Sequence, residues 1–149
     1  MKKLFLLLLL TPVFCLSQNF VFFGDNSYPS SDTITLNSQE KISFIKFGDS
    51  ISIYFQASYI LAYEEPQISR KFNIYLDDGS VITSIKADLY DYVNSNCISI
   101  YPLTDDDVSK LTMSNVNSIR YSIDKRNDYE QRIAKNTQYR TTDLIKSIL

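Results

Sequence analysis

The chain has 149 residues, with 15 basic and 17 acidic side chains and a formal net charge of −2. This length fits one ordinary domain, and the mild acidity argues against nucleic-acid binding, which needs concentrated lysine and arginine. The absence of histidine excludes Ser-His-Asp and Cys-His catalytic sites and the usual zinc sites. Only three widely separated glycines are present, so there is no glycine-rich phosphate loop. We therefore expect no cofactor and no metal.

The first segment has the order of residues found in secretory signals. Lys2 and Lys3 precede the apolar segment Leu4–Leu16, and polar residues begin at Ser17. A membrane-spanning helix needs about 20 apolar residues, so this segment is too short to span. We expect residues 1–17 to be a cleaved signal peptide, leaving residues 18–149 as a single periplasmic or secreted domain without a transmembrane segment.

The cysteines bear on both anchoring and folding. Cys15 and Ser17 are small residues of the kind signal peptidase prefers, which places the cut before Gln18. The alternative is a lipoprotein anchored through Cys15, which the bulky Phe14 before it disfavours. Loss of Cys15 leaves Cys97 alone, so no internal disulfide can form. The apolar run that Cys97 opens predicts its burial in a strand.

The exported part begins with short extended segments. Phe20–Phe23 is apolar and predicts a strand, and Thr33–Leu36 predicts another. Between them Gly24–Asp32 is rich in serine and contains Pro29, which is typical of a polar loop.

A long hairpin is predicted next. Lys41–Phe47 and Ile51–Tyr63 flank Gly48-Asp49, which suits a two-residue type II′ turn that pairs Phe47 with Ser50. The alternation predicts one face buried in the core. That apolar face comprises Ile42, Phe44, Ile51, Ile53, Phe55, Ala57, Tyr59, Leu61 and Tyr63. The opposite face of the second strand is expected to face water and comprises Ser52, Tyr54, Gln56 and Ser58.

A second hairpin is predicted around Asp78-Gly79. Lys71–Asp77 and Ser80–Lys86 flank these two residues, which suit a type I′ turn that pairs Asp77 with Ser80. The apolar face in this register comprises Leu76 opposite Val81, Ile74 opposite Thr83 and Phe72 opposite Ile85. On the wet face Tyr75 lies opposite Ile82.

The second half combines strands with two helices. Strands are predicted at Leu89–Val93, Cys97–Tyr101, Val116–Ile123 and Tyr129–Ala134. Thr104 is expected to cap a short helix that ends near Met113. Asn136 or Thr137 is expected to cap a C-terminal helix, whose apolar stripe comprises Leu144, Ile145, Ile148 and Leu149. The predicted fold is α+β: a mostly antiparallel twisted sheet or open barrel, or alternatively a sandwich, with the C-terminal helix packed on it.

Two acidic clusters are candidates for a cation site or for acid–base chemistry. Asp105-Asp106-Asp107 lies where the dipole of the predicted helix favours negative charge, and consecutive helical residues point in different directions. Asp77-Asp78-Gly79 lacks the alternating ligands of a calcium loop because Tyr75 occupies the preceding ligand position. We interpret both clusters as structural and assign no catalytic or metal-binding residue.

The eleven tyrosines are the remaining feature. Aromatic rings without tryptophan can form a stacking surface for a carbohydrate or a partner protein. Tyr54 and Tyr75 fall on the predicted wet faces, which makes them the candidate binding residues. The alternative is that aromatic residues are simply favoured in strands.

The chain resembles small exported proteins of unknown function that are typical of flavobacteria-like Gram-negative bacteria. The resemblance rests on the Lys-Lys-Leu-rich start ending in Ser17-Gln18, on the Asp-Gly hairpin within Ile74–Ile82, and on the segment from Leu103-Thr104 through Ile119-Arg120-Tyr121 with a helical end. The resemblance implies export, and it provides no activity that could be assigned to a residue of this chain.

These observations favour a non-enzymatic binding or structural module of the cell envelope. Its surface would be the exposed tyrosines or a free sheet edge that accepts another strand. The alternatives are a carboxylate-dependent hydrolase resembling a glycosidase, which needs two facing acids, and an inhibitor or immunity-type protein.

Overall fold

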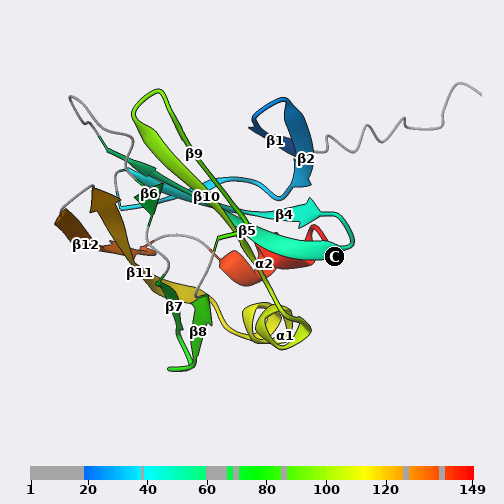
Figure 1. The fold of residues 1–149 in the computed structure, drawn as a ribbon. Helices are drawn as coiled ribbons and strands as arrows, with labels where there is room; N and C mark the ends of the chain where they lie inside the picture. The colour runs from blue at the N-terminus through cyan, green and yellow to red at the C-terminus, as the bar shows by residue number, and fades with distance from the viewer. Residues whose placement is uncertain are drawn as a thin grey trace, which may run out of the picture.

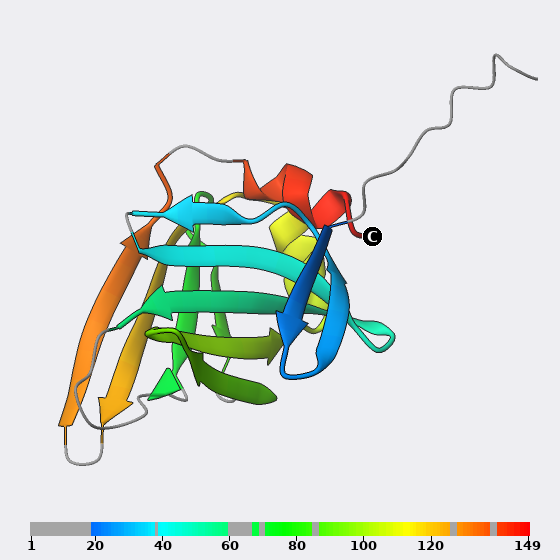
Figure 2. The ribbon, with the colours of Figure 1, turned by 90° about the horizontal axis from the view of Figure 1, so that it is seen from above.

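The computed structural model describes residues 19–37, 39–59, 67–68, 71–84, 87–125, 128–137 and 140–149. The predicted signal peptide and three residues of the predicted apolar faces, Leu61, Tyr63 and Ile85, lie outside the described residues. The α+β prediction is confirmed: two curled, antiparallel half-barrel sheets enclose a core, and two short helices accompany them (Figures 1 and 2).

The first sheet has the strand order β1-β2-β4-β5-β10-β9, with β3 beside β4. Its strands are β1 (Asn19–Phe23), β2 (Asn26–Ser30), β3 (Ile34–Leu36), β4 (Glu40–Phe47), β5 (Ser50–Ser58), β9 (Leu89–Val93) and β10 (Asn96–Pro102). The second sheet has the order β12-β11-β7-β8, with β6 beside β11. Its strands are β6 (Gln67–Ile68), β7 (Phe72–Leu76), β8 (Val81–Ser84), β11 (Val116–Lys125) and β12 (Asp128–Lys135). Figure 2 shows β11 and β12 crossing the strands of the first sheet steeply.

The β4–β5 hairpin confirms the predicted register, with Phe47 paired to Ser50 and Phe44 to Ile53. Gly48 has φ 64°, while Asp49 is not among the residues with positive φ. A positive φ at the first central residue alone is the requirement of a II′ turn. The alternating apolar residues of both strands therefore face the second sheet.

Aromatic rings join the two sheets at the centre of this core. Phe55 of β5 contacts Phe72 of β7 and Tyr121 of β11 edge to face, with ring centroids 4.9 and 4.8 Å apart. Phe72 also stacks on Tyr101 of β10 at 4.2 Å. Such contacts add about 0.5–1.5 kcal/mol each beyond the burial of apolar area.

The predicted register of the second hairpin is wrong by one residue. Ile74 pairs with Ile82 and Tyr75 with Val81. The Gly79 N–H donates to the Leu76 carbonyl at 3.0 Å, and Gly79 has φ 86°. This is a three-residue loop, a type I turn followed by a left-handed glycine, instead of a type I′ turn. Because a one-residue slip exchanges the two faces of a strand, Ile82 is buried and Val81 is exposed.

A second correction concerns the segment predicted as a polar loop from Gly24 to Asp32. It contains strand β2, which pairs with β1 along its whole length and joins β4 through Ser30 and Ile45. Figure 2 shows this hairpin, in blue, lying across the first sheet. It covers the face of β5 that was expected to face water, together with the adjoining face of β4, and forms a second, smaller core there. The buried residues of this core are Val21, Ile45, Tyr54 and Ile100.

The face of β5 beneath this hairpin carries a buried serine. The Oγ atom of Ser52 is fully buried and has no hydrogen-bond partner among the described residues. Ser31, also buried, is different: its Oγ accepts from the Phe44 N–H at 3.0 Å. An unmade hydrogen bond costs a buried hydroxyl about 1–3 kcal/mol, whereas a made one contributes about 1 kcal/mol.

These two serines give a matched test. We expect Ser52→Ala to leave the free energy of unfolding unchanged or to raise it by up to about 1 kcal/mol, because it removes an unsatisfied group. Ser31→Ala is expected to lower it by about 1 kcal/mol. Urea titration followed by circular dichroism measures both. A clear loss of stability in Ser52→Ala would show that its hydroxyl is satisfied in the folded protein.

The helices close one end of the sheets (Figure 2). Helix α1 (Asp105–Met113) begins after Thr104, as predicted, and buries Leu111. Helix α2 (Thr141–Lys146) begins later than predicted, after Arg140, so neither Asn136 nor Thr137 caps it. The Oγ1 of Thr141 instead accepts from the Val116 N–H at 2.7 Å. This bond fixes α2 to β11.

Ile145 on α2, and Ile148 just after the helix ends, confirm the predicted apolar stripe at two of its positions. Both are buried in the main core, Leu144 is partly buried against it, and Leu149 is 62% exposed. The prediction that the C-terminal helix packs on the sheet therefore holds for its first three apolar positions.

Candidate functional site

Tyr54 is not on the surface, contrary to the prediction. Its side chain is 7% exposed and belongs to the smaller core beneath the β1–β2 hairpin. Burial, and secondarily the charge of Asp91, raises the pKa of its hydroxyl. Tyr54 is therefore a core residue and offers no ring for stacking.

Tyr75 is half-buried on the outer face of the second sheet. The guanidinium of Arg120 on β11 lies 4.8 Å from the centre of its ring. A cation–π contact of this kind contributes about 0.5–1 kcal/mol at an exposed site. Because Arg120 covers the ring, Tyr75 forms a local surface contact, and the structure does not bring it together with Tyr54.

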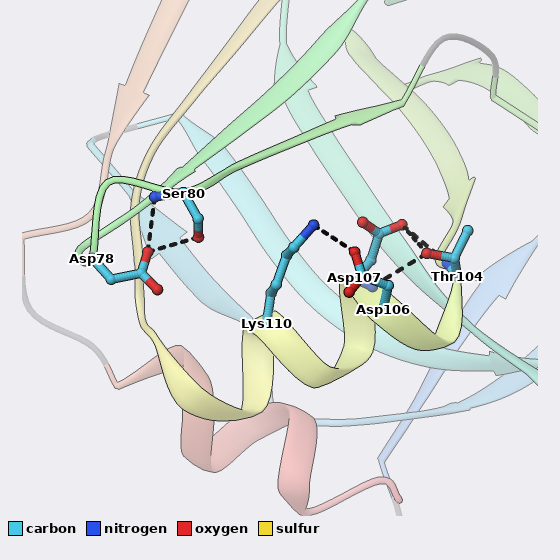
Figure 3. A network of polar contacts seen from close by, with 6 residues as sticks. All are labelled: Asp78, Ser80, Thr104, Asp106, Asp107 and Lys110. Carbon is cyan, nitrogen blue, oxygen red and sulfur yellow. Dashed lines mark hydrogen bonds and ion pairs between the residues drawn. The ribbon is translucent and has the colours of Figure 1, made fainter.

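Two of the three aspartates of α1 make contacts within the helix (Figure 3). Thr104 and Asp107 form a capping box, in which the Asp107 N–H donates to Thr104 Oγ1 and the Thr104 N–H donates to Asp107 Oδ2. Asp106 pairs with Lys110 one turn later. Nearby, the carboxylate of Asp78 accepts hydrogen bonds from the backbone and side chain of Ser80. These bonds lower the pKa of Asp78.

A polar cluster bridges the two sheets, partly in the interior and partly at the surface. The Tyr121 hydroxyl donates to Glu40 Oε1 at 2.8 Å, and both residues are buried. Arg132 of β12 donates to the Ser58 carbonyl at 3.1 Å and to Glu130 Oε1 at 2.9 Å, and its guanidinium lies over the Tyr59 ring. These bonds join β4 and β5 to β11 and β12. None of these residues lines the cleft at the start of β1. We therefore interpret the cluster as a structural link between the two sheets.

Cys97 is 1% exposed, which confirms its predicted burial in a strand. Burial raises the pKa of its thiol to about 11. At neutral pH the thiol is therefore protonated and unreactive, because the thiolate is the nucleophilic form.

Two exposed aromatic residues lie on β1, where the sequence had predicted only a short strand, and a third, Tyr90, lies on β9. Phe20 is 50% exposed and Phe22 is 71% exposed, while Val21 and Phe23 between and beside them pack into the smaller core. β1 is therefore a strand with one buried and one solvent-facing apolar face. Because all four residues from Phe20 to Phe23 are apolar, the sequence predicted a strand but did not indicate which of its faces is exposed to water.

β1 is also an edge strand of the first sheet in the described part of the chain. The two-residue loop at Gly24-Asp25 makes Phe23 and Asn26 the closing pair of the hairpin. Hydrogen-bonded and non-hydrogen-bonded pairs alternate from there, so Phe20 opposite Pro29 and Phe22 opposite Ser27 are non-hydrogen-bonded pairs. The lack of an N–H in Pro29 agrees with this assignment. The backbone N–H and C=O groups of Phe20 and Phe22 consequently point away from β2, towards the open edge.

A cleft of about 540 Å³ adjoins the start of β1. Its lining combines apolar and polar side chains: Asn19, Phe20, Ser30, Asp32, Thr33, Ile34 and Leu144. The Asn19 side-chain amide donates to Asp32 Oδ1. Among the described residues Asp32 is the single carboxylate of the lining, so this part of the chain supplies no facing pair of acids of the kind a glycosidase requires.

Comparison of the chain with models of protein families, with curated proteins and with solved structures finds no match. The site must therefore be interpreted from its own geometry. Within the described ranges, no three histidine, cysteine or acidic side chains gather as metal ligands. Neither of the two described helices is long and apolar enough to cross a membrane.

Proposed function

We propose that this chain is an exported, non-enzymatic binding module of the cell envelope that holds an extended segment of a partner protein along β1. The observation that carries the proposal is the combination, in one short edge strand, of two outward-facing phenylalanines and outward-facing backbone groups. Strand addition uses both: the main-chain hydrogen bonds supply affinity, and alternate side chains supply specificity.

The exposed edge is unusual because proteins normally protect such strands. Charged residues, proline or a bulge commonly blunt an edge against unwanted pairing. β1 has the sequence Asn-Phe-Val-Phe-Phe, with no charge and no proline. At the other end of the same sheet, edge strand β9 carries Asp91. An unprotected apolar edge is what an adding strand needs.

The first test is affinity capture with residues 18–149 immobilised and the envelope fraction of the producing cell as the source of partners. We expect Phe20→Ser/Phe22→Ser to reduce the retention of a specific partner on the order of 100-fold, because burying each ring contributes about 1.5 kcal/mol or more. Quantitative mass spectrometry measures the retained protein. Tyr90→Ser is the matched control, since Tyr90 is a 58% exposed aromatic residue on the opposite edge strand.

A backbone variant separates strand addition from simple apolar contact. Phe22→Pro removes an N–H that points to the open edge and that β1–β2 pairing does not use. We expect it to bind the partner more weakly than Phe22→Ala, with both variants keeping the circular dichroism spectrum of the parent. Equal binding by these two variants rules out pairing through this edge, and a partner lost only in Tyr90→Ser moves the site to β9.

A further inference from the structure

The β1 edge lies in a region of unbalanced charge. From Gln18 to Gln39 the sequence contains no lysine or arginine, while Asp25 and Asp32 are acidic and exposed. Asp32 is exposed, and no basic side chain of the described residues pairs with it. Lys46 on β4 and Lys146 on α2 are also absent from the cleft lining. An uncompensated carboxylate thus stands beside an exposed ring.

The cleft holds this carboxylate in place. The Asn19 amide occupies Oδ1 of Asp32, which leaves Oδ2 as an acceptor. Phe20, Ile34 and Leu144 give the cleft an apolar wall, and Ser30 and Thr33 add hydroxyl groups. A lysine or arginine side chain matches this combination, because its aliphatic stem packs on apolar surface while its charged end meets a carboxylate. The adjacent ring of Phe20 can add a cation–π contact.

We infer that the partner segment added along β1 is basic, and that it places a lysine or arginine side chain in the cleft between Phe20 and Asp32. This inference rests on the proposed function, since it needs a strand paired to β1. Side chains of an added strand alternate between the two faces. The residue that lies beside Phe20 on its exposed face is therefore close to the cleft, and its neighbours in the sequence point to the other face.

The test uses a displayed library of random 12-residue peptides selected on immobilised residues 18–149. Selections run in parallel on the parent, on Asp32→Asn, on Phe20→Ser/Phe22→Ser and on Asp105→Asn, the last being an exposed acid on α1 that does not line the cleft. We expect binders of the parent to be enriched in lysine or arginine at one position. Asp32→Asn should lose that enrichment and bind the selected peptides at least about tenfold more weakly, whereas Asp105→Asn should behave as the parent.

The outcomes separate this inference from the proposed function. Peptides that depend on Phe20 and Phe22 but show no basic preference, or that bind Asp32→Asn as well as the parent, overturn the inference and leave strand addition standing. Peptides that bind Phe20→Ser/Phe22→Ser as well as the parent overturn both. Replacing the enriched lysine of a selected peptide with norleucine should weaken binding to the parent only, because Asp32→Asn no longer distinguishes charge.

Discussion

Replacing Phe55 with alanine is expected to lower the free energy of unfolding by about 3–5 kcal/mol. The Phe55 side chain is fully buried and contacts both Phe72 and Tyr121 of the opposite sheet. Its removal forfeits the free energy gained by transferring a large apolar group out of water. It also leaves a cavity where the two sheets meet. Since a domain of this size has a total stability of about 5–15 kcal/mol, this one substitution is expected to bring the protein close to unfolding.

Urea unfolding at pH 7 measures the effect, and two variants calibrate it. Phe55→Leu retains most of the volume and is expected to cost about 1.5 kcal/mol or less. Phe22→Ala removes the same ring from an exposed position, where substitutions usually change stability by less than about 0.5 kcal/mol. If Phe55→Ala cost no more than Phe22→Ala, the two sheets could not meet at Phe55 as the structure has them.

Much of the fold was predictable because its strongest signals are local. The β4–β5 hairpin combines a glycine at the required turn position with alternation on both sides, and its register came out correctly. Thr104 and the following aspartates likewise determine the start of α1 within one turn of chain. Neither element needs information about distant residues.

The errors arose where the local signal was ambiguous. Asp78-Gly79 suits both a two-residue loop and a three-residue loop with glycine in the last position, and the two differ by one residue in register. The outcome decides whether Ile82 or Val81 is buried. The competition depends on how β7 and β8 pack against the rest of the core, which the turn residues do not encode.

We expected a binding surface at the exposed tyrosines or at a free sheet edge, but the sequence did not indicate β1 as that edge, for a related reason. Ser52 and Tyr54 make one face of β5 polar enough to predict contact with water, yet the β1–β2 hairpin covers it. The residues of that hairpin precede β5 by about 30 positions in the sequence. Pro29 made the segment that forms β2 resemble a polar loop. When β1 turns its Val21 face towards β5, Phe20 and Phe22 become the exposed aromatic residues in place of Tyr54.

Alkaline pH is expected to destabilise the protein steeply. Burial raises the pKa of Tyr101, and burial together with the hydrogen bond to Glu40 raises that of Tyr121. The pKa values of Tyr54 and Cys97 are raised as well. In each case the neutral form is favoured in the folded state, so the unfolded chain ionises first. The contributions of these groups to the free energy of unfolding are therefore constant below about pH 9. They fall as the pH rises towards the pKa values that the groups have in the folded state.

The size of the loss follows from the number of groups. Each group that ionises only on unfolding costs about 1.4 kcal/mol per pH unit. Cys97 contributes from pH 9, its ordinary value, to its folded pKa of about 11, and the three buried tyrosines contribute from pH 10 upwards. Two pH units for Cys97 and one each for Tyr101 and Tyr121 remove up to about 6 kcal/mol by pH 11, which is comparable with the whole stability of a domain. Urea unfolding at pH 8, 9, 10 and 11 measures this decline.

Two tyrosine variants assign the decline to buried groups. Tyr121→Phe lacks one of the four ionising groups, so its free energy of unfolding should fall less steeply above pH 10, by about 1.4 kcal/mol per pH unit. Its stability at pH 8 should be lower, because Glu40 loses a donor. Tyr90→Phe changes a ring that already lies in water, so its pH dependence should match that of the parent. A parent whose stability stays level from pH 8 to 11 would mean that water reaches these hydroxyls in the folded state, and that the aromatic core between the sheets is open.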